Sequence, residues 1–134
     1  MTTIFIDSGP FRAAANKSDD NHLKARAQFE ELGVGTFKLM TSDYVVDETY
    51  TGLLTRPGYW AAMGFDETLK VSRIKIEFIG QERFFKSQEV FRRFNKDKKW
   101  SFTDCTSYVV MKELKIKTVF AFDKNFEEMG FKVL

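Results

Sequence analysis

The sequence predicts an α/β fold of the three-layer α/β/α kind, in which a mainly parallel sheet of about four to five strands lies between two layers of helices. Two observations predict this class. Short apolar segments alternate with segments of helical spacing, as they do in right-handed crossover units. One apolar segment, 117–122, lacks the polar alternation of a half-exposed strand, which indicates a sheet covered on both faces. A length of 134 residues fits one domain, and we expect residues 1–134 to form it.

The strand candidates are rich in β-branched and aromatic residues. One of them alternates, with Ile74, Ile76 and Phe78 on one side, as a half-buried strand does. The first candidate stops at Asp7, after which Ser8-Gly9-Pro10 predicts a turn. In chain order the candidates are Thr2–Ile6, Thr36–Met40, Arg73–Ile79, Lys117–Phe122 and Phe131–Leu134.

Segments with helical spacing of their apolar residues link these strands. Pro57 and Gly58 separate two of the helices. The helix over 81–95 carries an apolar stripe between charged residues, which predicts a surface helix with one covered face. That stripe comprises Phe84, Phe85, Val90, Phe91 and Phe94. The expected helices run from Asp19 or Asp20 to Gly33, from Thr41–Asp43 to Pro57, from Tyr59 to Lys70, from Gln81 to Asn95, and onward from Ser101.

Composition excludes several classes of protein. A hydrophobic fraction of 43% with fifteen Phe is too apolar for a disordered chain. No apolar run approaches the length of a membrane span and the N-terminus lacks a secretion signal, so we expect a cytoplasmic protein with no membrane partner. A single cysteine, Cys105, and a single histidine, His22, offer neither an internal disulfide nor a Cys/His zinc site. Any metal must therefore be held by oxygen.

A basic cluster precedes Trp100 and leaves two interpretations open. The cations could hold a phosphate backbone while the indole stacks on a base. Alternatively, the cluster is a solvated helix end and the indole lies in the core. A net charge of +2 decides neither. The cluster comprises Arg92, Arg93, Lys96, Lys98 and Lys99.

Four acids far apart in the sequence are expected to share one cleft. Asp7 and Asp123 each follow a predicted strand, and ligands of parallel α/β sheets gather at the carboxyl ends of the strands. Asp104 lies in the first turn of a helix and can open onto the same edge. Glu48 lies on a helix face whose other residues are apolar, whereas Asp47 points about 100° away.

Carboxylates that lie within a few ångströms of one another repel, and each close pair costs on the order of a few kcal/mol. A cation would offset that cost. Mg²⁺ and Mn²⁺ prefer hard oxygen ligands and retain several waters, which suits a site without His or Cys. Such an ion could activate a water and orient a phosphodiester.

Each acid also has a purely structural interpretation. Asp7 and Asp123 stand in ordinary turn compositions. Ser101 and Asp104 match a capping box, in which the carboxylate closes back on the N-cap amide. Glu48 would be exposed if its helix were slightly rotated. Taken singly, these positions therefore leave structural and functional roles open.

The order and context of the acids resemble the PIN-domain family, and most closely its VapC-like toxin ribonucleases. The similarity spans nearly the whole chain. It rests on Ile4-Phe5-Ile6-Asp7-Ser8, on the helix segment Thr41 to Glu48, on Phe102-Thr103-Asp104-Cys105-Thr106-Ser107, and on Val119 to Phe126 with Gly130 and Leu134. The segment from Ser8 to Arg12 and the polar run from Asp19 to His22 differ from the family pattern, which bears on substrate preference.

The resemblance implies a metal-dependent endoribonuclease that hydrolyses single-stranded or structured RNA. The four acids would be the catalytic residues and the ligands of Mg²⁺ or Mn²⁺, with Ser8 and Thr103 supporting them by hydrogen bonds. It further implies the toxin of a type II toxin–antitoxin pair, a homodimer, and a small antitoxin protein as partner. An RNA-processing nuclease without an antitoxin, or a degenerate module that binds RNA or protein without cutting, are the alternatives within the family.

One rival from another class is a phospho-accepting receiver domain, which is also a parallel α/β fold with acids at strand ends. That class requires an acidic pair after the first strand and an Asp after a middle strand. Ser8-Gly9 and Ile79-Gly80 occupy those positions, so the sequence disfavours it.

Overall fold

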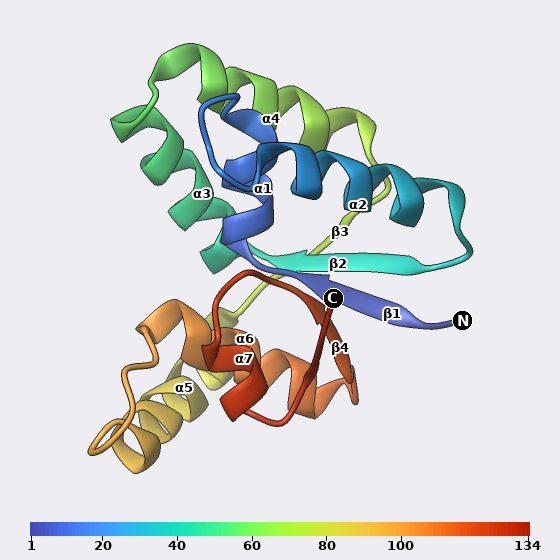
Figure 1. Cartoon of the computed structure of the whole chain (residues 1–134). Coiled ribbons are helices and arrows are strands. Elements are labelled where there is room, and N and C mark those ends of the chain that lie inside the picture. Colours follow the sequence, from blue (N-terminus) through green and yellow to red (C-terminus); the bar gives the residue numbers. More distant parts are fainter.

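The computed structural model describes all of residues 1–134 and contains one five-stranded sheet between two layers of helices (Figure 1). The strand order is β3-β2-β1-β4-β5, and all four pairings are parallel. The predicted fold class is therefore confirmed. The elements are β1 Thr3–Ile6, α1 Ser8–Ala15, α2 His22–Val34, β2 Lys38–Ser42, α3 Asp43–Thr55, α4 Tyr59–Val71, β3 Lys75–Glu77, α5 Gly80–Phe94, α6 Phe102–Glu113, β4 Thr118–Phe120, α7 Asn125–Glu128 and β5 Lys132–Val133.

The chain direction reverses at the centre of the sheet. From β1 the chain moves outward through β2 to β3, then returns past β1 to β4 and β5. Helices α1–α4 cover one face and α5–α7 the other (Figure 1). The reversal leaves a switch point between β1 and β4, where Ile6 pairs with Phe120, and this is where parallel α/β sheets form ligand sites.

The central strand carries the core. Ile4, Phe5 and Ile6 are all fully buried, because β1 has a neighbour on each side and helices on both faces. Phe11 and Phe65 pack edge to face on one side of the sheet, with ring centroids 5.1 Å apart. None of the helices is long and apolar enough to cross a membrane.

The segment after Asp7 is a helix, α1, and the predicted turn at Ser8-Gly9-Pro10 is wrong. Proline is tolerated in the first turn of a helix because amides there have no intrahelical acceptor. Asp7 is the N-cap residue, with extended backbone angles of φ −84° and ψ 171°. The first acid therefore stands at the junction of β1 and α1, at the positive end of a helix dipole.

The apolar stripe predicted for α5 is only partly covered. Phe84, Val90 and Phe94 pack against the core, but Phe85 and Phe91 are 54% and 42% exposed. The reason is that α5 lies at the outside of its layer and packs mainly against α6, so a narrow face is covered. Phe78, expected on the covered side of its strand, is also exposed.

Trp100 lies in the core. This confirms the interpretation in which the basic cluster is a solvated helix end and the indole is buried. Its side chain is only 3% exposed and stacks between Phe94 and Tyr108. The indole N–H donates to Glu128, 3.1 Å away, and the Asn95 amide pairs with both backbone groups of Trp100. The indole is therefore not available to stack on a base.

We predict that Trp100→Ala lowers the free energy of unfolding by about 3–5 kcal/mol, because it removes a large buried ring and leaves a cavity. Trp60 is the matched control, since its ring is 82% exposed. Trp60→Ala should change stability by less than about 0.5 kcal/mol. Urea denaturation of both variants measures this, and equal effects would contradict the assigned place of Trp100.

Candidate acidic active site

Asp7 is the most enclosed of the four predicted acids. Its side chain is 5% exposed, and its Oδ1 atom is buried without any hydrogen-bond partner. The backbone holds the residue in place, because the Asp7 amide donates to the Phe120 carbonyl at 3.0 Å and so ties the end of β1 to β4. A buried carboxylate oxygen without a donor is costly, which points to a missing partner.

Glu48 approaches from α3 and is anchored by Ser8. The Ser8 hydroxyl donates to Glu48 Oε1 at 2.6 Å, so the residue that follows Asp7 orients the second acid. Glu48 is half-buried, whereas the neighbouring Asp47 is exposed on the other side of the helix. This placement agrees with the predicted choice of Glu48 and with the supporting role expected of Ser8.

Asp104 both caps α6 and faces the other acids. Its backbone amide donates to Ser101 Oγ at 3.0 Å, and the Ser101 amide donates to Asp104 Oδ2 at 3.3 Å, which completes the capping box. The Asn125 side-chain amide donates to the same oxygen at 2.9 Å. No protein hydrogen bond reaches Oδ1. The two interpretations of Asp104 are therefore compatible, because each uses a different oxygen.

Asp123 is the most exposed of the four, and it is oriented by Asn125. The Asn125 backbone amide donates to Asp123 Oδ1 at 2.9 Å, and the Asn125 side chain reaches Oδ2 at 3.4 Å. Asn125 thus links Asp123 to Asp104. Asn125 was not a predicted site residue, because the local sequence indicates a turn at this position and does not reveal the contact with Asp104.

Thr103 does not have the hydrogen-bonding role that the resemblance implied. Its hydroxyl makes no hydrogen bond to any of the acids, and its carbonyl accepts from the Thr106 hydroxyl at 2.6 Å within α6. At the second position of the helix its side chain points away from Asp104 by about 100°. Asn125 supplies the support expected of Thr103.

Burial and neighbouring carboxylates raise the pKa of Asp7 and of Asp104. Burial raises the pKa of Asp7 from 3.8 to about 8, with Asp104, Glu48 and Asp123 adding repulsion. Burial likewise raises the pKa of Asp104, and the charges of Asp123 and Glu48 raise it further. The donors Ser8 and Asn125 oppose these shifts but do not cancel them. The structure therefore brings all four predicted acids into one electrostatic cluster.

The residues suit a hard divalent cation in chemistry. All the donors are carboxylate oxygens, and Asp7 Oδ1 lacks a partner that a cation would provide. The side chains are not, however, drawn around a common centre: no group of three or more His, Cys, Asp or Glu is placed to hold a metal ion. Repulsion among the four carboxylates is expected to keep them apart when no cation is bound.

Arg12 is a cation at the rim of this site that the sequence analysis did not single out. Arg12 lies one helical turn after Ser8, and Gly52 lies one turn after Glu48, so the two pairs face each other between α1 and α3. A Cβ atom at position 52 would lie 2.8 Å from Arg12 Cζ. Gly52 therefore makes room for the guanidinium.

The fold and the site together define a class, namely a parallel α/β protein with an acidic cluster at the switch point. The PIN-domain family model matches residues 4–132, and the chain belongs to the PIN-domain family. It is 29% identical over 128 residues to the 23S rRNA-specific endonuclease VapC20 of Mycobacterium tuberculosis, covering 96% of this chain and 95% of the relative.

Solved structures agree with this assignment. The crystal structure of M. tuberculosis VapC20, described as a sarcin–ricin loop cleaving toxin, is similar with a TM-score of 0.86 and 28% identity, over 96% of this chain and 95% of that one. FitAcB from Neisseria gonorrhoeae is similar with a TM-score of 0.63, over 98% of this chain and 96% of that one. Its identity of 15% supports the fold alone.

We predict that the metal-free protein becomes less stable as the pH rises from about 4 to about 8. The folded state keeps the Asp7 proton up to a pKa of about 8, while the unfolded chain releases it near 3.8, so folding binds a proton in this window and a higher pH opposes folding. Asp7→Asn removes this loss. The variant should match wild type near pH 4 and exceed it by at least about 1 kcal/mol at pH 8.

Urea denaturation in metal-free buffer at several pH values measures this difference. Asp47→Asn is the control, because Asp47 is exposed on the far side of α3 and should leave the pH dependence unchanged. A wild type that gained stability over Asp7→Asn as the pH rose would contradict the assigned environment of Asp7.

Proposed function

We propose that this protein is an endoribonuclease that depends on Mg²⁺ or Mn²⁺. The observation that carries the proposal is the buried Asp7 carboxylate, whose Oδ1 has no partner, near three further acids at the switch point of a PIN fold. Asp7, Glu48, Asp104 and Asp123 would hold the metal. When bound, a divalent cation would offset their repulsion, lower the pKa of a water and stabilise charge on the phosphodiester.

The chain's own residues orient this site. Ser8 holds Oε1 of Glu48 and leaves Oε2 without a hydrogen bond from this hydroxyl. Asn125 and the capping box occupy Oδ2 of Asp104, so that Oδ1 is the oxygen left for a ligand. Arg12, which lies over Gly52 and one helical turn after Ser8, is a cation that could meet a substrate phosphate.

The substrate we propose is a single-stranded segment within a structured RNA. The similarity to VapC20 over nearly the full length of both chains supports the sarcin–ricin hairpin of 23S rRNA as the first RNA to test. The same similarity supports a role as the toxin of a type II pair, held inactive by a small antitoxin protein.

We predict that purified protein cuts a hairpin RNA containing the sarcin–ricin loop with Mg²⁺ or Mn²⁺ and not with EDTA, and that Asp104→Asn abolishes cutting. In EDTA the variant should keep or gain stability, because a neutral side chain relieves repulsion. Its stabilisation by Mg²⁺ should fall, because it binds the ion less tightly.

The control is Ser101→Ala, which removes the cap hydroxyl and leaves the carboxylate. It should cost about 1 kcal/mol in both conditions and retain cutting. Thermal unfolding and gel assays provide the readouts. RNA cutting that persists in EDTA would contradict the metal mechanism. An Asp104→Asn variant that is destabilised equally in EDTA and in Mg²⁺ and still cuts RNA would also contradict it.

We also propose a homodimer that covers the exposed aromatic side chains of α5 and of the segment between β3 and α5. Phe78, Phe85 and Phe91 are 68%, 54% and 42% exposed, which is unusual for a small monomer. Light scattering at micromolar concentration should give twice the chain mass, and Phe85→Glu should give a monomer. Leu23→Glu, at an exposed position on α2, should remain dimeric. A monomeric wild type would contradict the proposal.

A further inference from the structure

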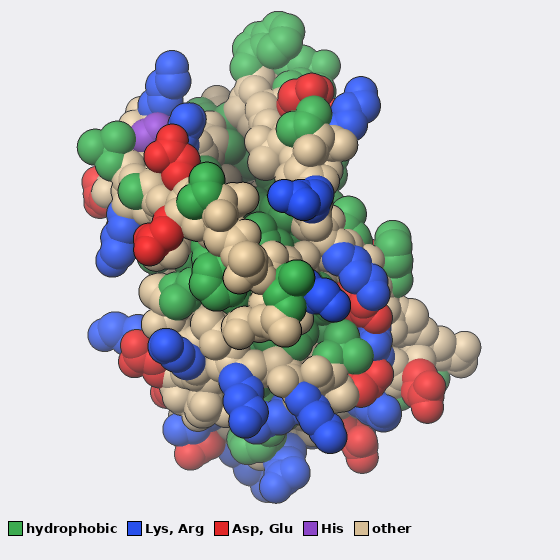
Figure 2. Space-filling view, turned by 90° about the vertical axis from the view of Figure 1, so that its right-hand side faces the viewer, with side chains coloured by type: hydrophobic (Ala, Val, Ile, Leu, Met, Phe, Trp, Pro, Cys, Tyr) green, Lys and Arg blue, Asp and Glu red, His purple; other side chains and the backbone are tan.

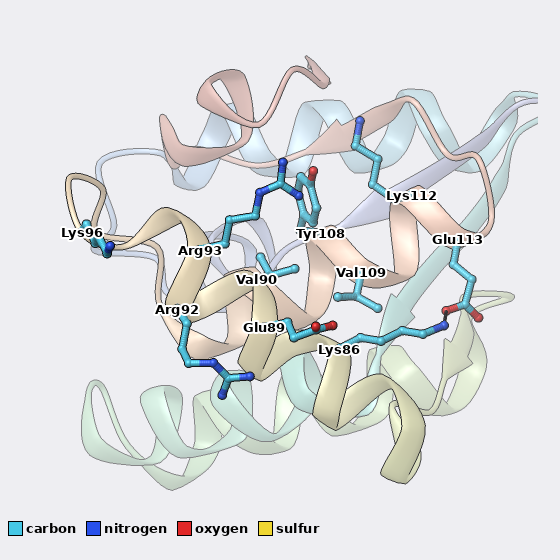
Figure 3. Close-up of a pocket in the computed structure, with 10 residues that line it drawn as sticks. All are labelled: Lys86, Glu89, Val90, Arg92, Arg93, Lys96, Tyr108, Val109, Lys112 and Glu113. Carbon is cyan, nitrogen blue, oxygen red and sulfur yellow. Dashed lines mark ion pairs between the residues drawn. The ribbon is translucent and has the colours of Figure 1, made fainter.

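A groove of about 810 Å³ lies between α5 and α6, in the layer of helices on the sheet face opposite α1 (Figure 1; Figure 3). It begins close to the acidic site, because Tyr108 in its wall is one helical turn after Asp104 on α6. From there it follows α6 to Lys112 and Glu113. A strand of nucleic acid leaving the acidic site along α6 would enter this groove directly.

The groove has more positive than negative charge. Its two acids are Glu89 and Glu113, and Glu113 is already paired with Arg83 at 3.1 Å and Lys86 at 3.7 Å. The remaining cations make no ion pair within the protein. These unpaired cations are Arg92, Arg93, Lys96 and Lys112.

Two of these cations are held in place by aromatic rings. The Lys112 ammonium lies 5.6 Å from the Tyr108 ring centroid and 5.3 Å from that of Phe131. The Arg93 guanidinium lies 5.1 Å from the Phe94 ring centroid. Figure 3 shows Arg93 and Lys112 pointing to the same side of the groove, on either side of Tyr108. Contact with the rings orients these cations without neutralising them, so their charge is available to an anion.

The whole layer around the groove is basic. Residues 80–134 contain twelve Lys and Arg against eight Asp and Glu, although two of those acids belong to the acidic site. Residues 1–79 contain nine against eleven. Figure 2 shows Lys and Arg side chains gathered over the lower half of the molecule, where α5–α7 lie. A modest net charge of +2 therefore conceals a basic layer on one side of the sheet.

We propose that the α5/α6 groove binds the phosphate backbone of RNA beside the cut site, with Arg93 and Lys112 as the principal contacts. This inference rests on the proposed ribonuclease function. An acidic protein segment is the competing occupant. RNA is favoured because only three of the ten lining residues are apolar, whereas the centre of a protein interface needs apolar anchors. Tyr108 in its wall lies one helical turn from Asp104, so a backbone bound in the groove lies beside the cut site.

The test measures binding separately from cutting. A fluorescein-labelled hairpin RNA containing the sarcin–ricin loop is titrated with protein in EDTA at several salt concentrations. Arg93→Gln with Lys112→Gln should weaken binding about tenfold and reduce the slope of log affinity against log salt by about 1.5. Arg26→Gln with Lys70→Gln, at exposed unpaired cations of α2 and α4, is the matched control and should change neither.

A second double variant tests the groove without removing any cation–π contact, in case the Arg93/Lys112 variant fails to fold. Arg92→Gln with Lys96→Gln removes charge from the rim of the groove at positions that contact no aromatic ring, and it should weaken binding in the same direction. With Mg²⁺, both groove variants should raise KM for the hairpin and leave kcat within about twofold, because neither touches the acids.

The possible outcomes distinguish a failure of the proposed groove from a failure of the proposed ribonuclease function. A wild type that binds and cuts the hairpin, with groove variants equal to the Arg26/Lys70 control, would overturn the groove alone. A wild type that neither binds nor cuts RNA would overturn the ribonuclease function as well. Tighter binding of fluorescein-labelled oligoglutamate than of RNA, lost in the Arg93/Lys112 variant, would assign the groove to an acidic protein segment.

Discussion

Repulsion among carboxylates at the end of β1 is the constraint on which the functional half of this structure depends. Asp7 is buried with one oxygen unpartnered, and three further acids raise its pKa. Such an arrangement lowers the stability of the metal-free protein, and a well-packed apolar replacement would avoid it. The packing of β1, the most buried strand of the sheet, compensates for this loss of stability. β1 lies between two parallel neighbours, and the Asp7 amide donates a hydrogen bond to the Phe120 carbonyl, so the position of Asp7 is fixed.

The reversal of chain direction explains how residues from distant segments come together. β1 and β4 are neighbours in space although more than a hundred residues separate them, and helices α1 and α6 begin at the same edge of the sheet. Three of the acids are then oriented by a hydrogen-bond donor from a nearby side chain or backbone. Ser8 serves Glu48, and Asn125 serves Asp104 and Asp123 together. The two layers differ in charge, because residues 80–134, which form α5–α7, contain more Lys and Arg than Asp and Glu, whereas residues 1–79 contain fewer.

Features of the fold and the site that depend on local sequence patterns could be predicted. Features that depend on tertiary contacts could not. The strand end at Asp7, the inward face of Glu48 and the capping box of Asp104 were all predictable, because each follows from a few neighbouring residues. The strand before Asp123 is shorter than predicted, since β4 ends at Phe120 and Asp123 lies in the loop before α7. Helix α1 was missed since Gly9 and Pro10 usually mark turns, although a helix N-terminus accepts both. The role of Asn125 arises only when α7 meets α6, and it displaced the role that resemblance had given to Thr103. Phe85 and Phe91 are exposed because neighbouring helices cover only a narrow face of α5. The spacing of apolar residues along a helix does not predict how wide the covered face is.

The central claim is that the four acids bind one class of divalent ion, and the most direct measurement maps where that ion sits. Fe²⁺ in place of Mg²⁺, with ascorbate and peroxide, generates hydroxyl radicals that cut the polypeptide backbone near the bound ion, and mass spectrometry locates the cuts. The account predicts cuts beside Asp7, Glu48, Asp104 and Asp123, suppressed by excess Mg²⁺ and absent in Asp7→Asn. Cuts confined to other segments, or a pattern that Asp7→Asn leaves unchanged, would contradict it.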